Sequence, residues 1–240
     1  LILSNVLAAK LPGIENKYGY ATYLISGLIM WTLFSEIISR STTLFLENAS
    51  LLKKISFPRS TLPVILIGSC LLNYTMLLAV SLLIISLLGV NFNITLLWLL
   101  PLTFVVVLFA GSIGLILAVL NVFVRDIGHV TPILLQILFW FTPIVYPINI
   151  VPDSLKELLE YSPLYYLANA YQSILTYGTH PELSGLVTVC LSSVVIPLLG
   201  AWIFRRASPE MVDVLWASPS RISAKLSLLT IQNGTESWNG

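Results

Sequence analysis

The chain has 240 residues, of which 57% are hydrophobic and 10% are charged, and its formal net charge at pH 7 is +1. Soluble domains carry roughly 25% charged residues, so this composition excludes a water-soluble protein. The mean hydropathy of +0.91 indicates an integral membrane protein. Because the charges nearly cancel, they become informative only when each is assigned to one side of the membrane.

Uncharged stretches separated by polar loops predict membrane-spanning helices, because about 20 helical residues cross the hydrocarbon core of a bilayer. The predicted elements, in chain order, are an apolar stub (1–9), a long helix (18–46), two spans (62–88 and 96–124), a proline-interrupted segment (127–152), a polar and aromatic segment (153–182) and a last span (183–204). We expect the stub to be the end of a first helix that is mostly missing. A cleaved signal peptide is the competing interpretation, but no basic stretch precedes the stub.

The proline-interrupted segment is expected to be broken or to cross only half of the membrane. It contains Pro132, Pro143 and Pro147, and proline lacks the backbone donor that a helix interior uses. Irregular backbone at membrane depth is tolerated only where protein shields it.

The topology follows from the run 60–124, which contains no Asp, Glu, Lys or Arg. Two spans folded back at 89–93 return the chain to the side it left, so the basic residues before the run and after it face one compartment. An excess of Lys and Arg in short loops marks that compartment as the cytoplasm. With the first helix restored, six crossings place both ends in the cytoplasm.

Several kinds of chemistry find no support in the sequence. It contains no phosphate loop of the Gly-x-x-x-x-Gly-Lys-Ser/Thr type, and His129 and His180 form no metal-binding pair. Cys70 and Cys190 lie in apolar spans, where a free thiol acts as a small hydrophobic group. No carboxylate is expected near the middle of a span, although ion-coupled carriers usually keep one there. Energy for uphill transport would therefore come from elsewhere.

Two cytoplasmic segments are candidates for contact with a partner. Residues 48–59 predict a short helix that Asn48 or Ser50 caps and Pro58 ends. It fits either a helix lying on lipid phosphates or a knob docked into a soluble partner. In the second segment, Arg125 and Asp126 occupy a tight turn, which is either a partner contact or a plain topological stop.

Aromatic residues crowd into the later part of the chain and form the third candidate site. Such residues often form interfacial belts in membrane proteins, but they also stack on the apolar faces of sugars. Trp31 and Phe34 share one helix face and could join the same lining. The candidate channel residues are Trp31, Phe34, Phe139, Trp140, Phe141, Tyr146, Tyr165 and Tyr166.

Five motifs follow one another along residues 1–214. They are residues 48–59 with Leu62-Pro63, Asn121 with Arg125-Asp126, the stretch Thr142-Pro143-Ile144-Val145-Tyr146-Pro147, Ser162-Pro163-Leu164, and Phe204-Arg205-Arg206. Taken together, these motifs resemble the permease subunits of type-2 ABC exporters, in the branch that exports O-antigen, teichoic acid and capsule-like polysaccharides.

The resemblance implies an all-α integral membrane fold of six transmembrane helices, with a re-entrant external helical segment before the last span. It implies a single transmembrane domain (1–214) and leaves residues 215–240 as a flexible cytoplasmic tail. The subunit would be a homodimer in the bacterial inner membrane, bound to two copies of an ATPase. The residues that would couple to that ATPase are Leu51, Lys53, Lys54, Ile55, Phe57, Pro58, Arg59, Asn121, Arg125 and Asp126.

Under this interpretation the chain is a transport subunit and not an enzyme. It would hold no cofactor itself, and ATP and Mg²⁺ would bind to the ATPase partner. The substrate would be a lipid-linked polysaccharide, and no nucleic acid is involved. Alternatives are an exporter of drugs or other small molecules, a membrane-embedded glycosyl- or acyltransferase that uses His129 and Asp126, and a passive scaffold without an ATPase partner.

Overall fold

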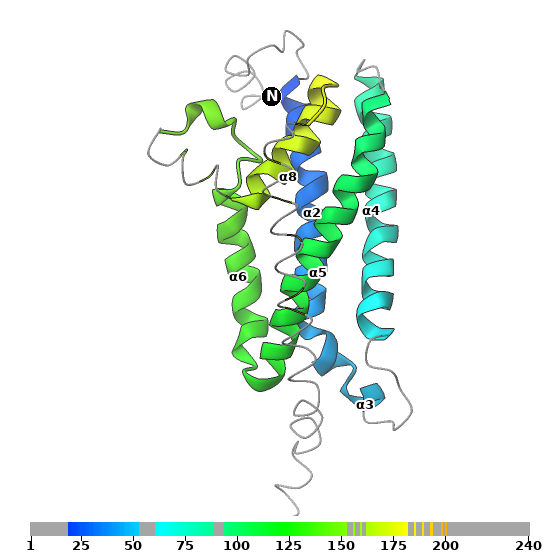
Figure 1. Cartoon of the computed structure of the whole chain (residues 1–240), viewed down its shortest axis with the longest axis vertical. Coiled ribbons are helices and arrows are strands. Elements are labelled where there is room, and N and C mark those ends of the chain that lie inside the picture. Colours follow the sequence, from blue (N-terminus) through cyan, green and yellow to red (C-terminus); the bar gives the residue numbers. More distant parts are fainter. Residues whose placement is uncertain are drawn as a thin grey trace, which may run out of the picture.

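The computed structural model describes residues 19–52, 61–88, 94–152 and 162–181, and isolated positions at 156, 159, 185, 189, 193, 198 and 200. All the elements assigned in these ranges are helical (Figure 1). They are α2 (Gly19–Glu47), α3 (Ala49–Leu52), α4 (Thr61–Leu87), the 3-10 helix η1 (Ile94–Trp98), α5 (Leu99–Phe123), α6 (Asp126–Phe141), the 3-10 helix η2 (Ile148–Ile150), α8 (Pro163–Gln172) and the π-helix η3 (Ser173–Tyr177).

Three helical stretches are long and apolar enough to cross a membrane: α2, α4 and the continuous run Ile94–Phe123. They coincide with the three spans predicted over 18–46, 62–88 and 96–124, and they make the chain a multi-pass membrane protein. Helix α6 has 16 residues, or about 24 Å, which is shorter than the ~30 Å hydrocarbon core. The stub 1–9, the turn 89–93, the segment 53–60, most of the last predicted span and the tail 215–240 lie outside the described residues.

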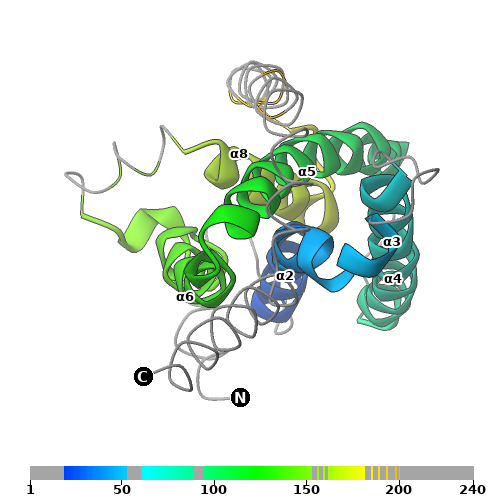
Figure 2. The same ribbon diagram turned by 90° about the horizontal axis from the view of Figure 1, so that it is seen from below.

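Helix α2 is the centre of the bundle and packs against α4, α5, α6 and α8 (Figures 1 and 2). Its contact with α5 is close because α5 has a glycine at the crossing. A Cβ atom on Gly114 would lie 2.6 Å from Ser41 Cβ. Small residues at such crossings let helix backbones approach in membranes. Further along the contact, the rings of Phe34 and Phe109 stack with centroids 6.0 Å apart.

Helix α4 lies at the edge of the bundle and turns an apolar surface outward. Val64, Leu72, Met76 and Leu83 are each at least 60% exposed. Only one side of the helix is buried, through residues such as Tyr74. This outward face has the composition expected of a surface in contact with lipid chains.

The proline-interrupted segment is broken at the second of its three prolines and not at the first. Pro132 lies inside α6 without ending it, although an interior proline removes a backbone donor and crowds the carbonyl four residues before it. The helix ends at Phe141, immediately before Thr142 and Pro143. The Thr142 amide then donates to the Leu138 carbonyl at 2.9 Å, so the last turn is closed despite the following proline.

The expectation that no carboxylate lies near the middle of a span was wrong. The Asn73 amide donates to Glu36 Oε1 at 2.8 Å, which places Glu36 level with the middle of α4 (Thr61–Leu87). The helix itself was predicted correctly, over 18–46, and α2 runs to Glu47. What the sequence did not give is the depth of Glu36, which follows a long uncharged stretch and is placed only by its contact with Asn73 on α4.

Candidate functional site

An aromatic groove lies between α2 and α6. It has a volume of about 420 Å³ and is lined by Leu28, Trp31, Leu135, Gln136, Phe139 and Trp140. The Trp31 and Phe139 ring centroids are 5.4 Å apart, and those of Phe139 and Trp140 are 5.8 Å apart. Trp31 is 9% exposed and Trp140 is 59% exposed. The cluster is therefore anchored in the bundle and open at its Trp140 side.

Two other predicted channel residues line a neighbouring apolar cleft of about 410 Å³. Phe34 and Phe141 lie on its walls, which α2, α5 and α6 supply. Phe34 also contacts Trp31, with ring centroids 5.6 Å apart, so the two residues share one face of α2 as predicted. They line different cavities, however, Trp31 the groove and Phe34 the cleft. Phe109 stacks on Phe34 from α5, and the sequence offered no signal for that partner.

The segment that follows α6 is docked onto the Gly19 end of α2. Tyr20 Oη donates to the Val145 carbonyl at 3.0 Å, and Tyr23 Oη donates to the Pro143 carbonyl at 3.3 Å. The fit is close at Gly27, where a Cβ atom would lie 2.9 Å from Ile144 Cγ2. The motif 142–147 is thus fixed to α2 through its backbone carbonyls and one buried side chain.

Tyr146, another predicted channel residue, closes the end of α6. Its hydroxyl donates to the Trp140 carbonyl at 2.8 Å. Burial raises the pKa of the Tyr146 hydroxyl above its usual value, because a charged phenolate is poorly solvated there. The hydrogen bond from this hydroxyl holds the backbone of Trp140 at the rim of the aromatic groove.

Helix α8 carries the remaining predicted channel residues, Tyr165 and Tyr166. Their rings contact each other with centroids 5.2 Å apart, but neither residue lines the aromatic groove. α8 is held to the bundle by a triad of hydroxyls from three helices. Tyr171 Oη lies 2.9 Å from Thr103 Oγ1 and 3.1 Å from Tyr74 Oη.

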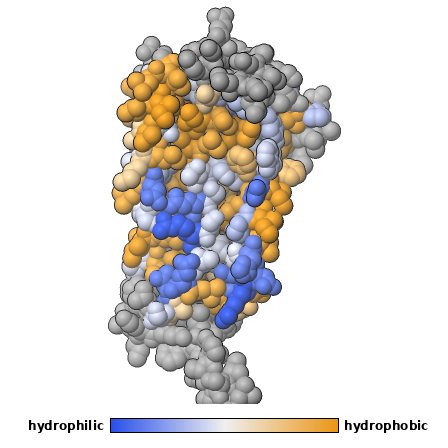
Figure 3. Space-filling model, turned by 180° about the vertical axis from the view of Figure 1, so that it is seen from behind, coloured by the Kyte–Doolittle hydropathy of each residue, from blue (hydrophilic) through white to orange (hydrophobic). Residues whose placement is uncertain are grey.

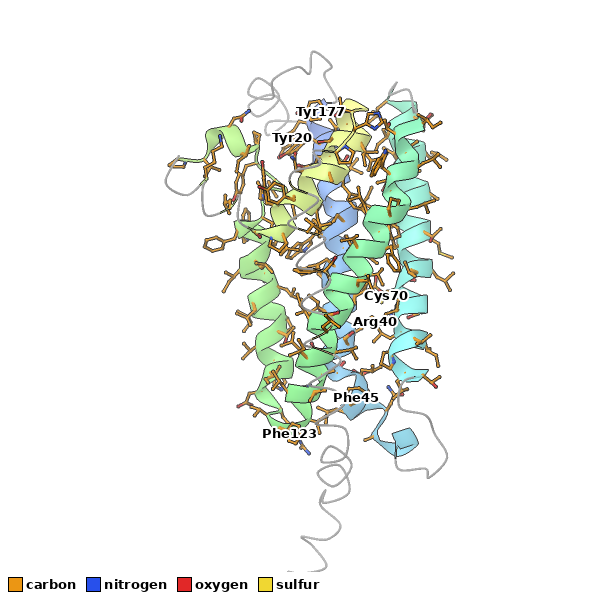
Figure 4. All side chains as sticks on the ribbon, viewed as in Figure 1. Tyr20, Arg40, Phe45, Cys70, Phe123 and Tyr177 are labelled. Carbon is orange, nitrogen blue, oxygen red and sulfur yellow. The ribbon has the colours of Figure 1, made fainter. Side chains whose placement is uncertain are left out.

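A polar stripe runs along α2 toward its Glu47 end. We define it as Thr32, Ser35, Glu36, Ser39, Arg40 and Thr43. Arg40 Nη1 pairs with Glu36 Oε1 at 3.0 Å and also donates to Cys70 Sγ at 3.7 Å. Figure 4 shows Arg40 and Cys70 facing each other between α2 and α4. The spacing of three and four residues is visible in the sequence, so this stripe could have been found there and was missed.

The first candidate for contact with a partner, residues 48–59, is described only as far as Leu52. The Asn48 side-chain amide donates to the Leu44 carbonyl at 2.9 Å, which closes the end of α2. Leu51 lies in α3, and the positions from Lys53 through Arg59 are outside the described residues. Their predicted role in coupling stays a prediction.

The second candidate for contact with a partner contains one buried residue, Asn121, and two exposed ones, Arg125 and Asp126. Asn121 is 1% exposed. Its amide donates to the Thr42 carbonyl at 2.8 Å, and its Oδ1 accepts the Gly128 amide at 2.9 Å. Arg125 and Asp126 are exposed at the turn between α5 and α6. Asn121 is therefore an internal link between α2 and this turn, whereas the two charged residues lie on the surface.

The enzyme alternative finds little support in the geometry. Asp126 and His129 are both exposed in the first turns of α6 and line none of the cavities described above. Among the described residues, no group of three or more His, Cys, Asp or Glu side chains could hold a metal ion.

Comparison with known proteins agrees with the pattern of membrane helices. The family model for ABC-2 type transporters matches residues 1–176. The chain is 24% identical to the O-antigen export system permease protein RfbA of Klebsiella pneumoniae, over 82% of this chain and 76% of that protein. It is 27% identical to the RfbA protein of Myxococcus xanthus, over 83% and 77%. It is 26% identical to the polysialic acid transport protein KpsM of Escherichia coli, over 88% and 83%.

Proposed function

Because the chain belongs to the ABC-2 type transporter family, we propose that it is the membrane subunit of an ATP-driven exporter of a lipid-linked polysaccharide. As a permease it is a transport subunit and not itself an enzyme. The names of its relatives support a polysaccharide substrate, since they refer to O-antigen export and to polysialic acid transport. The membrane would be the bacterial cytoplasmic membrane.

Membership of this family implies a nucleotide-binding partner. We propose two copies of a separate ATPase, which bind ATP and Mg²⁺, on a homodimer of this chain. The full permease would have six transmembrane helices and a re-entrant external segment, to which residues 142–147 and the helices α8 and η3, all in contact with α2, would belong. The Glu47 end of α2 would then face the cytoplasm, and α3 would lead into the ATPase contact.

The observation that carries the substrate proposal is the open aromatic groove. Sugar rings present apolar C–H faces that stack on aromatic side chains. Trp31, Phe139 and Trp140 supply such surfaces side by side, and Gln136 adds a hydrogen-bonding group to the same wall. The neighbouring cleft is more apolar, with Phe34 and Phe141 on its walls. That cleft favours the second candidate function, export of a small hydrophobic molecule.

Polysaccharide export and small-molecule export can be distinguished with two substitutions, one of an exposed aromatic residue in the groove and one of an exposed aromatic residue outside it. Trp140 is 59% exposed, and Phe104 on α5 is 63% exposed but lines neither cavity. We expect Trp140→Ala to lower polysaccharide export at least about fivefold, from the loss of ~1 kcal/mol of ring stacking. Phe104→Ala is the matched control and should export normally.

Export is measured as polymer reaching the cell surface, with the amount of folded permease determined in the same cells. Equal export by the Trp140→Ala and Phe104→Ala variants would contradict the role of the groove. Efflux of a hydrophobic dye that depends on Phe141, with no polymer exported, would favour the small-molecule function.

A further inference from the structure

The polar stripe of α2 is exposed at Thr32 and Arg40 and half-buried at its other positions, at a depth where lipid is the expected surroundings. Its ion pair is level with Asn73, which lies twelve residues after Thr61 and fourteen before Leu87 in the apolar helix α4. Arg40 is 46% exposed and Glu36 is 23% exposed in their side chains. Figure 3 shows hydrophilic side chains in the middle of this face, with hydrophobic areas on both sides.

Contact with lipid chains does not fit this surface. Charged residues within spans are rare and face the interior of the bundle or a water-filled cavity. The outward face of α4 shows what a lipid-facing surface of this protein looks like, since Leu72 and Met76 are exposed there. The stripe differs from that face in both charge and hydroxyl content.

The Thr32 and Ser35 hydroxyl groups of the stripe already donate to backbone carbonyls, so they are available to a partner mainly as hydrogen-bond acceptors. Thr32 Oγ1 donates to the Leu28 carbonyl at 2.7 Å, and Ser35 Oγ donates to the Thr32 carbonyl at 3.3 Å. A hydroxyl whose proton is used in this way still has lone pairs that accept. Arg40 adds N–H donors, and its charge is balanced by Glu36. Such a surface suits an uncharged partner that both donates and accepts hydrogen bonds, as sugar hydroxyls do.

The stripe also continues the aromatic groove. Leu28 and Trp31 line the groove, and Thr32 and Ser35 are their neighbours at helical spacing on α2. Toward the Glu47 end, Ser39, Arg40 and Thr43 line a cleft of about 410 Å³ that reaches Asn48. A continuous surface thus runs from the end of α2 that leads into α3 up to the aromatic cluster.

We propose that the polar stripe is the hydrophilic wall of the transport path below the aromatic groove, and that it takes an uncharged, hydroxyl-rich sugar chain. This inference rests on the proposed function, which it extends from the aromatic groove to a second set of substrate contacts. The polymer would exchange hydrogen bonds with water for hydrogen bonds with the stripe.

The first test asks whether water reaches the stripe. Single cysteines are introduced as Ser39→Cys and Thr43→Cys in the full transporter complex, and inside-out membrane vesicles are treated with a charged, membrane-impermeant maleimide. Ser50→Cys, exposed in α3, reports access from the vesicle exterior, and Leu72→Cys is the lipid-facing control. The parent protein gives the background from its native cysteines.

We expect Ser39→Cys and Thr43→Cys to be labelled at least about tenfold faster than Leu72→Cys, because the reactive thiolate needs a polar, accessible environment. Labelling of Ser50→Cys without labelling of Ser39→Cys and Thr43→Cys would overturn the inference, since another helix or lipid would then cover the stripe. This result does not depend on which substrate the protein exports.

The second test asks whether the polymer uses the stripe. A bulky maleimide on Ser39→Cys should reduce polysaccharide export at least about fivefold, whereas the same adduct on Leu72→Cys should not. Unchanged export with a labelled Ser39→Cys would also overturn the inference. The stripe would then be accessible to water but would not lie on the route that the polymer takes. If the stripe is labelled and no polysaccharide is exported by the parent protein, the proposed function fails instead.

Discussion

Removal of the Asn121 side chain should loosen the connection between α2 and the turn that joins α5 to α6. Asn121 is almost fully buried and makes two hydrogen bonds, to the Thr42 carbonyl and from the Gly128 amide. Thr42 lies near the end of α2, five residues before Glu47. The side chain therefore ties the helix that leads into α3 to the segment that carries Arg125 and Asp126.

The expected magnitude follows from these two bonds. Each contributes a net ~1 kcal/mol, and a buried polar group left without a partner costs about 1–3 kcal/mol. Asn121→Ala removes both bonds and leaves the Thr42 carbonyl and the Gly128 amide without this partner. We expect a loss of about 2–4 kcal/mol in the free energy of unfolding, which lowers Tm by roughly 5–15 °C for a protein of this size.

The loss is measured as thermal unfolding of the purified protein in detergent, followed by the monodisperse fraction that survives heating. Asn149→Ala is the matched control, because Asn149 is exposed in η2. Its Tm should stay close to that of the parent, since exposed substitutions usually change stability by less than about 0.5 kcal/mol.

A Tm of Asn121→Ala within about 2 °C of the parent would refute this reasoning. It would mean that water or a rearranged turn replaces both bonds without loss. If the Tm falls as expected while the ATPase activity of the complex no longer responds to substrate, Asn121 would also be a positioning residue for coupling. A structural role alone would lower Tm and leave that response intact.

Three further outcomes follow from other contacts. Gly114→Ala should destabilise the α2–α5 crossing and lower Tm, because the new Cβ would lie 2.6 Å from Ser41 Cβ. Gly68→Ala is the control: its new Cβ would have no atom within 4 Å, so its Tm should be unchanged or slightly raised. Tyr171→Phe should cost about 1 kcal/mol by removing the hydroxyl between Thr103 and Tyr74, measured as a lower Tm; a Tm equal to that of the parent would show that the triad adds nothing. Changing Lys53, Lys54 and Arg59 to Glu should abolish co-purification of an ATPase from detergent, and undiminished co-purification would exclude these charges from the contact.

Much of the fold was predictable because crossing a membrane requires a long apolar helix. The bounds of α2, α4 and α5 agree closely with the uncharged stretches in the sequence. The end of α6 was predictable only in part. Pro132 and Pro143 are the same residue type, but Pro132 is accommodated within the helix and the helix ends before Pro143. The difference arises because the segment after Phe141 finds partners in Tyr20 and Tyr23 on α2.

The candidate sites were predictable where local spacing sufficed. Trp31 and Phe34 were expected on one face of a helix, and their rings do contact each other. The sequence also suggested that the late aromatic residues belong together, but the structure separates them. Phe139 and Trp140 join Trp31 in the groove, whereas Tyr165 and Tyr166 pair with each other on α8. Which rings meet depends on how α6 and α8 pack, and no local pattern encodes that packing.

The sequence by itself determined that this is a membrane protein, where its main spans lie and which family its segments resemble, because hydropathy and span length act locally along the chain. Only the tertiary structure decided the depth of Glu36 and the burial of Asn121. Each depends on a contact between residues far apart in the chain, Glu36 with Asn73 and Asn121 with Thr42. The role of a side chain within the membrane depends on the residue that it contacts on a neighbouring helix, and that contact is determined by how the helices pack.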